Sequence, residues 1–337
     1  MATAVSHTLT FPPLTWRETA VPQKVMKTTS YYSETQTTLA IGNFLAEFQN
    51  IELHGPPQTP NAHRSVFVHP PYMMQSVRLI ENVQQFAKLA ERHQLRLQRV
   101  KAARDNANDK TKQFLRTQFY DENGQERLLA NGRATLAEIK QLLQEAVDQK
   151  IIPWSEDRRA YRAWLKTYGL GIDCSGFVEQ ALQRLVEISY GERKLEQIPK
   201  VPFLRSGWVC QSILGQTERE NGKFDVVLRP FQAKPGDILV NQHHMRIIIN
   251  THFLEDGIIF EAAESTSAKD IPAGQAEEEN DIGPRLILLK YPHPDQPITK
   301  QNPLKRRVMD PQFAPDADEK TYLIGRYQLL NWEGSGN

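Results

Sequence analysis

Apolar residues recur every three or four positions in the middle of the chain and gather in short runs in its last third. The helical spacing is clearest at Leu79, Val83, Phe86 and Ala90, with polar residues between them. This spacing predicts helices over about 76–104, 109–119, 135–150 and 175–189. Strand-like runs occupy about 224–228, 238–240, 244–250, 257–262, 285–291 and 322–330. Helices followed by a set of strands favour an α+β fold with an antiparallel sheet.

Prolines set the first 75 residues apart from the rest of the chain. Because proline fixes φ and removes a backbone donor, we interpret 1–75 as an extended proline-rich arm that lies on the remainder. Its apolar run, Thr38–Leu53, fits either a strand or a short helix. A mainly helical region of unknown role is expected over 76–152 and a mixed domain over 153–337, with the boundary near Ile151–Pro153.

Composition narrows the class of protein. The chain has 337 residues and a net charge of +1. Because it has only 2 cysteines, a disulfide scaffold and a four-cysteine zinc module are excluded. The near-zero net charge gives no reason to expect nucleic acid as a partner. The segment Ser76–Tyr120 is locally basic, which fits a solvated helix face or a contact surface for an anionic polymer or partner.

No segment has the length and apolarity of a membrane span, and the first residues lack the features of a secretory signal. We therefore expect a cytoplasmic protein, or one exported or injected without a classical signal peptide.

The most informative segment is Gly171–Val178, where Cys174 stands at the start of a predicted amphipathic helix. A helix N-terminus presents free amide protons and the positive end of the helix dipole, and both favour a reactive thiolate. The same amides could stabilise an oxyanion. The competing interpretation is a small buried hydrophobic residue, the common role of a free cysteine. Asp173 is interpreted as the helix N-cap.

A nucleophilic cysteine needs a base, and the base needs a group that orients it. His243 and His244 open an apolar strand, and because successive side chains of a strand alternate, only one can face the cysteine. Glu261 and Glu264, in the next strand, could hold the imidazole.

These segments together resemble the NlpC/P60 cysteine peptidases. The resemblance is carried by Asp-Cys-Ser-Gly-Phe-Val at 173–178, Pro-Gly-Asp at 235–237 and His-Met-Arg-Ile-Ile-Ile at 244–249, and it covers about 161–330. It implies a papain-like α+β fold, with Cys174 as nucleophile and His244 as base. It also places the third polar residue at Glu261, with Glu264 as the alternative. Arg246 departs from the small residue common in the family, and Glu261 from its usual His, Asn or Gln.

The resemblance implies a thiol hydrolase that cleaves peptide bonds, most often in the stem peptides of bacterial peptidoglycan, without a cofactor. The N-terminal region would then position the enzyme on its substrate, or on a delivery or phage-type assembly. Two alternatives stay open: a thiol acyltransferase or deamidase-type effector toxin, and a non-catalytic interaction protein with a degenerate peptidase domain.

Three further candidates have simpler interpretations. Tyr168 could face the cleft or serve in packing, and Cys210 is interpreted as a core residue because it lacks a helix-start context. A zinc site formed by His243, His244 and His252 is conceivable, but no acidic neighbour at helical spacing supports it. No metal is expected.

Overall fold

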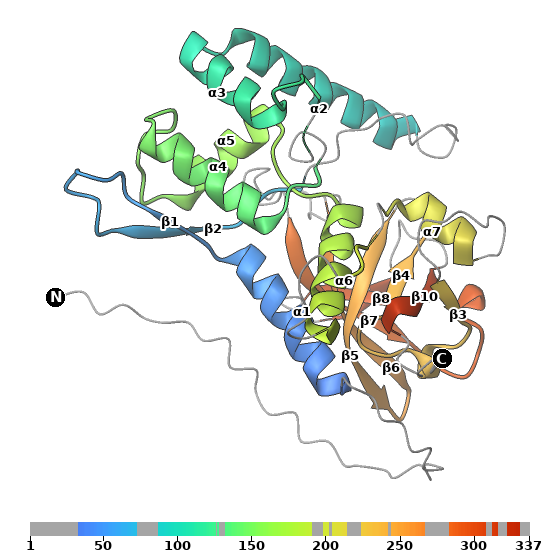
Figure 1. Ribbon diagram of the computed structural model, residues 1–337. Helices are drawn as coiled ribbons and strands as arrows, with labels where there is room; N and C mark the ends of the chain where they lie inside the picture. The colour runs from blue at the N-terminus through green and yellow to red at the C-terminus, as the bar shows by residue number, and fades with distance from the viewer. Residues whose placement is uncertain are drawn as a thin grey trace. The chain divides into compact units, whose positions relative to one another are not determined.

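The computed structural model describes residues 33–72, 87–125, 127, 132–190, 198–201, 204–213, 224–241, 244–266, 283–307, 312–315 and 322–330. All of them belong to one compact unit, Tyr31–Trp332 (Figure 1). Its α-helices are α1 (Glu34–Gln49), α2 (Ala87–Asn106), α3 (Asp109–Phe119), α4 (Leu136–Asp148), α5 (Arg158–Tyr168), α6 (Cys174–Tyr190) and α7 (Ser206–Ile213). Its strands are β1 (Ile51–His54), β2 (Ser65–Val68), β3 (Phe224–Val227), β4 (Ile238–Val240), β5 (Met245–Leu254), β6 (Gly257–Ser265), β7 (Pro284–Tyr291), β8 (Leu304–Arg307), β9 (Ala314–Pro315) and β10 (Leu323–Tyr327).

The larger sheet has eight strands in the order β3-β10-β4-β5-β6-β7-β8-β9, and every neighbouring pair is antiparallel. The predicted α+β class is therefore confirmed. The strands β3, β4, β5, β6, β7 and β10 lie where the apolar runs predict them. The structure adds the short strands β8 and β9 and the separate two-stranded sheet of β1 and β2.

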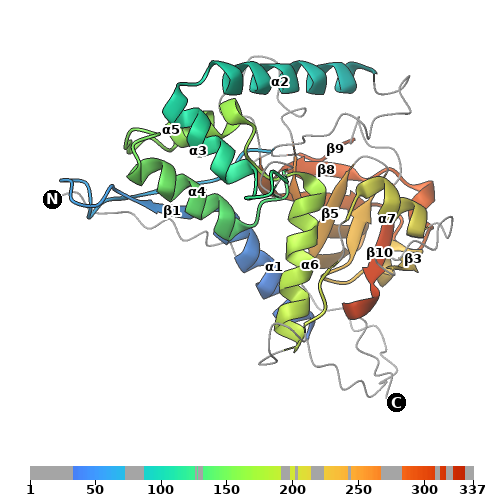
Figure 2. The ribbon, with the colours of Figure 1, turned by 45° about the horizontal axis from the view of Figure 1, so that its top comes forward.

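The two faces of the larger sheet are covered differently. Helices α1, α6 and α7 pack on one face (Figure 2), where Met245 and Ile247 of β5 join a core that also contains Phe177 and Leu182 of α6. A second core on the opposite face contains apolar residues of the same strands, including Ile248. The alternation of β5 residues between the two cores agrees with the period of a strand.

Residues 33–72 are not the extended arm that the prolines predict. Ser33 caps α1 through a capping box with Gln36, and the proline-free stretch that follows forms four turns of helix. The buried face of α1 packs on α6, where Phe48 lies edge-on to Phe177 with ring centroids 5.7 Å apart. Thr38 Oγ1 donates to the carbonyl of Ile249 at 2.8 Å, which fixes α1 to β5.

The predicted helices of the middle region are present where the structure describes them. α3 and α4 match their expected bounds, and the capping box of Thr135 and Glu138 forms as predicted. The start of the long predicted helix, 76–86, lies outside the described residues, and α2 covers the rest of it. Buried residues of α3, α4 and α5 share one core with α6, so the boundary expected near Ile151–Pro153 does not separate two compact units.

No helix among the described residues has the length and apolarity needed to cross a membrane.

The packing of α1 predicts the response to truncating Phe48. Phe48→Ala is expected to lower the free energy of unfolding by about 3–5 kcal/mol, because a fully buried aromatic side chain is replaced by a cavity. Leu39→Ala is the matched control on the same helix, where 59% of the side chain is exposed and the change should be small. Urea denaturation measures both, and equal small losses would contradict the docked helix.

Candidate functional site

Cys174 is the first residue of α6, as the sequence predicts. Asp173 acts as the helix cap, since its Oδ1 accepts a hydrogen bond from the Gly176 amide at 2.5 Å. The turn before the cysteine is held from two sides. The Asp173 amide donates to Gly132 O at 2.9 Å, and Ser265 Oγ, at the end of β6, donates to Ile172 O at 2.7 Å. Cys174 is thereby fixed beside the end of β6.

Hydroxyl groups and a strand amide surround the Cys174 sulfur. Its Sγ lies 3.9 Å from Ser175 Oγ and 3.9 Å from Ser206 Oγ, and the two hydroxyls are 3.3 Å apart. The backbone amide of Met245, the first residue of β5, also hydrogen bonds to the sulfur. Only 4% of Cys174 is exposed. A substrate carbonyl can therefore reach the sulfur only after some of its covering groups move.

The pKa of the Cys174 thiol moves in the direction opposite to the one that a helix start predicts. Burial raises this pKa to about 11, and the neighbouring Asp173 carboxylate adds to the increase. The carboxylate that caps α6 occupies the positive end of the helix and so offsets its effect on the thiol. The hydrogen bonds from Ser175, Ser206 and Met245 favour the thiolate but do not outweigh burial. At neutral pH the group is a thiol.

His244 lies just before β5 and is held by a carboxylate of the next strand. Its Nε2 is 2.8 Å from Glu264 Oε2, and both side chains are buried. Because a carboxylate can only accept, Nε2 carries the proton and Nδ1 keeps its lone pair. The backbone amide of His244 donates to Asn241 Oδ1 at 2.8 Å, which fixes the start of the strand.

Glu264 is fully buried and is surrounded by positive charge. Arg246 Nε lies 2.5 Å from its Oε2, Arg285 Nε lies 2.7 Å from its Oε1, and Lys305 Nζ lies 3.8 Å from its Oε1. Burial by itself would raise the pKa of Glu264, but these charges outweigh it and hold the pKa well below its usual value. Burial lowers the pKa of His244, although Glu264 favours its charged form. The pair is a neutral imidazole on an ionised carboxylate.

The candidate nucleophile approaches the candidate base through Met245, the residue after His244, and their side chains form no direct hydrogen bond in the described residues. The sulfur touches the amide of Met245, and His244 is the preceding residue. Within the described residues, the side-chain hydrogen-bond partners of Cys174 are hydroxyls and that of His244 is Glu264. The structure thus brings the two residues to one corner of the sheet, with the thiol and the imidazole bonded to other groups. The His244 side chain shares the sheet face of Arg246, whereas α6 packs on the face of Met245 and Ile247.

The predicted placement of Glu261 beside His244 is wrong. Glu261 Oε1 lies 2.9 Å from His252 Nε2, and the alternative, Glu264, holds His244. The physical reason is strand alternation, since residues three apart in β6 point to opposite faces of the sheet. His244, Arg246 and Glu264 share one face, because the Glu264 carboxylate contacts both the histidine and the arginine.

The other residues singled out in the sequence have structural surroundings. Tyr168 packs edge-on against Trp164, with centroids 5.2 Å apart, and Cys210 is a buried free cysteine of the core, as predicted. Asp237 of the Pro-Gly-Asp turn pairs with Arg326 through two 2.8 Å contacts.

The conceivable zinc site is not assembled by the residues that can be placed. His244 and His252 are each bonded to a different glutamate, and His243 lies outside the described residues. No group of metal-ligating side chains suited to an ion occurs among the residues that the structure describes.

Four side chains of the site could not be found from the sequence pattern. Ser206, Arg285 and Lys305 come from separate elements, and Arg133 reaches Asp173 at 3.6 Å and Glu179 at 2.6 Å from the loop before α4. Only the unusual Arg246 within an apolar strand signalled a buried partner of opposite charge.

A scan against protein-family models and searches of curated proteins and of solved structures found no match to this chain.

The surroundings of Glu264 predict a large stability difference between two glutamates of one strand. Glu264→Gln should lower the free energy of unfolding by about 3–5 kcal/mol, because it removes the buried carboxylate charge that Arg246 contacts at 2.5 Å. Glu261→Gln, whose ion pair with His252 is partly exposed, should change stability by less than about 1 kcal/mol. Urea denaturation of the full chain compares them, and a reversed order would refute this assignment.

The raised pKa of Cys174 predicts slow alkylation of the native protein. Iodoacetamide labelling of Cys174, followed by peptide mapping, should keep accelerating up to about pH 11. The same chain in urea should reach its plateau near the ordinary thiol pKa of about 8.5. Rapid labelling at pH 6 in the native protein would show instead that the thiol is activated at rest.

Proposed function

We propose that this protein is a papain-like thiol hydrolase of the NlpC/P60 type, in which Cys174 attacks a peptide or amide carbonyl and His244 transfers the proton. The proposed substrates are peptide bonds in the stem peptides of bacterial cell-wall peptidoglycan. The proposal rests on the sequence resemblance together with one feature of the site. That feature is the pairing of His244 with Glu264 at a position next to Met245, the residue whose backbone amide contacts the Cys174 sulfur.

This arrangement supports a base that acts through Nδ1. Glu264 fixes the tautomer in which Nε2 is protonated, and it stabilises the imidazolium that forms when Nδ1 takes a proton. The carboxylate remains ionised because of the cations around it. Glu264 therefore replaces Glu261 as the orienting residue in the proposed mechanism.

The proposed reaction begins with both partners neutral. As Sγ of Cys174 bonds to the substrate carbonyl carbon, the thiol proton passes to Nδ1 of His244. The C–N bond then breaks, Nδ1 returns the proton to the leaving amine, and a thioester remains. Water adds to the thioester with His244 again as base, and the acid is released as the proton returns to sulfur.

A non-catalytic role is the second candidate, and the state of the thiol favours it. Cys174 is buried, its pKa is raised, and its side-chain hydrogen-bond partners are hydroxyls rather than an imidazole. These are properties of a structural cysteine. In that case the domain would serve as a scaffold for binding.

Incubation with purified peptidoglycan and mass analysis of the released fragments separates these functions. A hydrolase releases fragments with a new amine and a new acid, whereas an acyltransferase yields an acylated acceptor. Cys174→Ala should abolish release, and His244→Ala should lower it at least 100-fold through loss of the general base. Cys210→Ser is the matched cysteine control and should retain release, because Cys210 is a core residue of α7 and is not among the side-chain hydrogen-bond partners found for Cys174 in the described residues.

Two results would contradict the proposal. The first is an unchanged rate in folded Cys174→Ala, and the second is full activity in His244→Ala. Absence of fragments from every peptidoglycan type would favour the non-catalytic candidate.

A further inference from the structure

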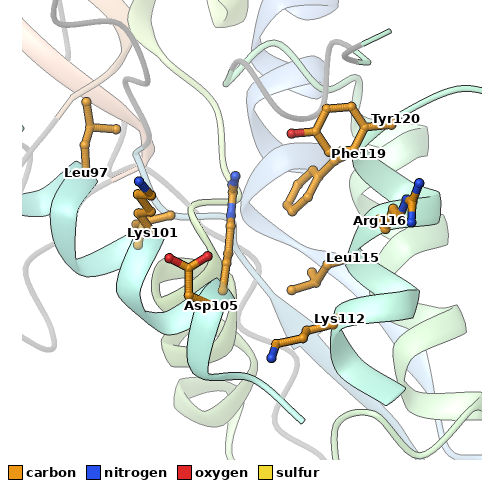
Figure 3. Close-up of a pocket in the computed structure, with 10 residues that line it drawn as sticks. Leu97, Lys101, Asp105, Lys112, Leu115, Arg116, Phe119 and Tyr120 are labelled. Atoms are coloured by element: carbon orange, nitrogen blue, oxygen red, sulfur yellow. The ribbon is translucent and has the colours of Figure 1, made fainter. Parts of the chain in front are cut away.

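A groove lies between α2 and α3, which play no part in the proposed chemistry. It encloses about 350 Å³, and each helix contributes one face to it, from Leu97 to Asp105 and from Lys112 to Tyr120 (Figure 3). Both sets of lining residues follow the spacing i, i+3, i+4, i+7 and i+8, which is one side of a helix. With a rise of 1.5 Å per residue, the groove extends for about 12 Å along each helix.

The floor of the groove is apolar. Val100, Leu115 and Phe119 are buried there, and Leu97 is half-buried. Figure 3 shows the Phe119 and Leu115 side chains directed from α3 toward α2. A ligand that fills this floor gains from burial of its own apolar groups.

The walls of the groove are basic. Lys101 of α2 and Lys112 and Arg116 of α3 are exposed, and none of the described carboxylates forms a salt bridge with these three. Arg104 is held in place, since its Nε and Nη2 donate to Tyr168 O at 3.0 and 2.7 Å and its guanidinium lies 4.2 Å from the Phe119 ring centroid. Asp105 is the acidic residue of the lining.

The cationic groups are spread along the groove. In Figure 3 the ends of Lys101, Lys112 and Arg116 lie on different sides of the opening. A compact phosphate would need donors that converge on one point. Spread cations over an apolar floor match an elongated ligand that carries several negative charges and apolar groups between them.

We propose that this groove binds an acidic peptide segment of a partner protein, with one or two apolar side chains on the floor and carboxylates against Lys101, Lys112 and Arg116. A peptide also has backbone N–H groups, and the Asp105 carboxylate can accept hydrogen bonds from them. A polynucleotide carries negative charge on every unit, so the Asp105 carboxylate would oppose it. A helix-lined groove with apolar anchors and charged walls is a recurring mode of peptide recognition.

Fluorescence polarisation with a labelled dodecapeptide of alternating Glu-Leu pairs tests this proposal on the full chain. The double variant Lys101→Glu/Lys112→Glu should weaken binding at least tenfold, since both walls reverse their charge. The matched control is Arg99→Glu/Lys140→Glu, which reverses two exposed cations outside the groove lining and should bind within twofold of the original chain. Both double variants should retain the circular dichroism of the original protein.

Probe variants identify the ligand class. Replacing the leucines by serine, or the glutamates by lysine, should each weaken binding at least tenfold. Equal binding of either altered peptide would overturn the proposal, as would equal affinities of the two double variants. Tighter binding of oligo-dT than of the peptide, lost in Lys101→Glu/Lys112→Glu, would overturn it in favour of a nucleic-acid ligand.

Discussion

One buried carboxylate joins four adjacent strands of the sheet. Glu264 of β6 is contacted by Arg246 of β5, Arg285 of β7 and Lys305 of β8, and it also holds His244 at the start of β5. An ionised carboxylate in such a place requires compensation by positive charge, which these three cations supply. The position and tautomer of His244 therefore depend on an ionic cluster that crosses the sheet.

The corner where Cys174 lies shows a conflict between two effects on a thiol. A helix start lowers the thiol pKa, whereas burial and a neighbouring carboxylate raise it. Here Asp173 both caps α6 and supplies that carboxylate, and the raised pKa follows. Reactivity in the proposed enzyme would then arise from changes that accompany substrate binding, because the buried thiol is protonated and its side-chain partners are hydroxyls.

The sequence predicted the elements of this site better than its contacts. The start of α6 at Cys174 and the course of β5 and β6 followed from local pattern, because short-range sterics and burial determine them. To choose between Glu261 and Glu264, one has to know which side chains of β5 and β6 point to the same face of the sheet. The pairing of these strands has an irregular register near Ile249, which the sequence pattern does not reveal. Ser206 contacts the sulfur from 32 residues away, and no local pattern encodes such a contact.

The docking of α1 has a consequence for the modular organisation of the chain. The motifs near Cys174 and His244 suggest a self-contained C-terminal module. However, Phe48 of α1 packs against Phe177 of α6, and Gln49 Nε2 donates to Pro284 O at the start of β7. The unit that must fold is larger than the unit that carries the candidate chemistry. Removal of α1 would therefore expose the apolar side of α6 and the edge of the core that Phe48 covers, so a fragment that begins at α5 would lack part of its own core.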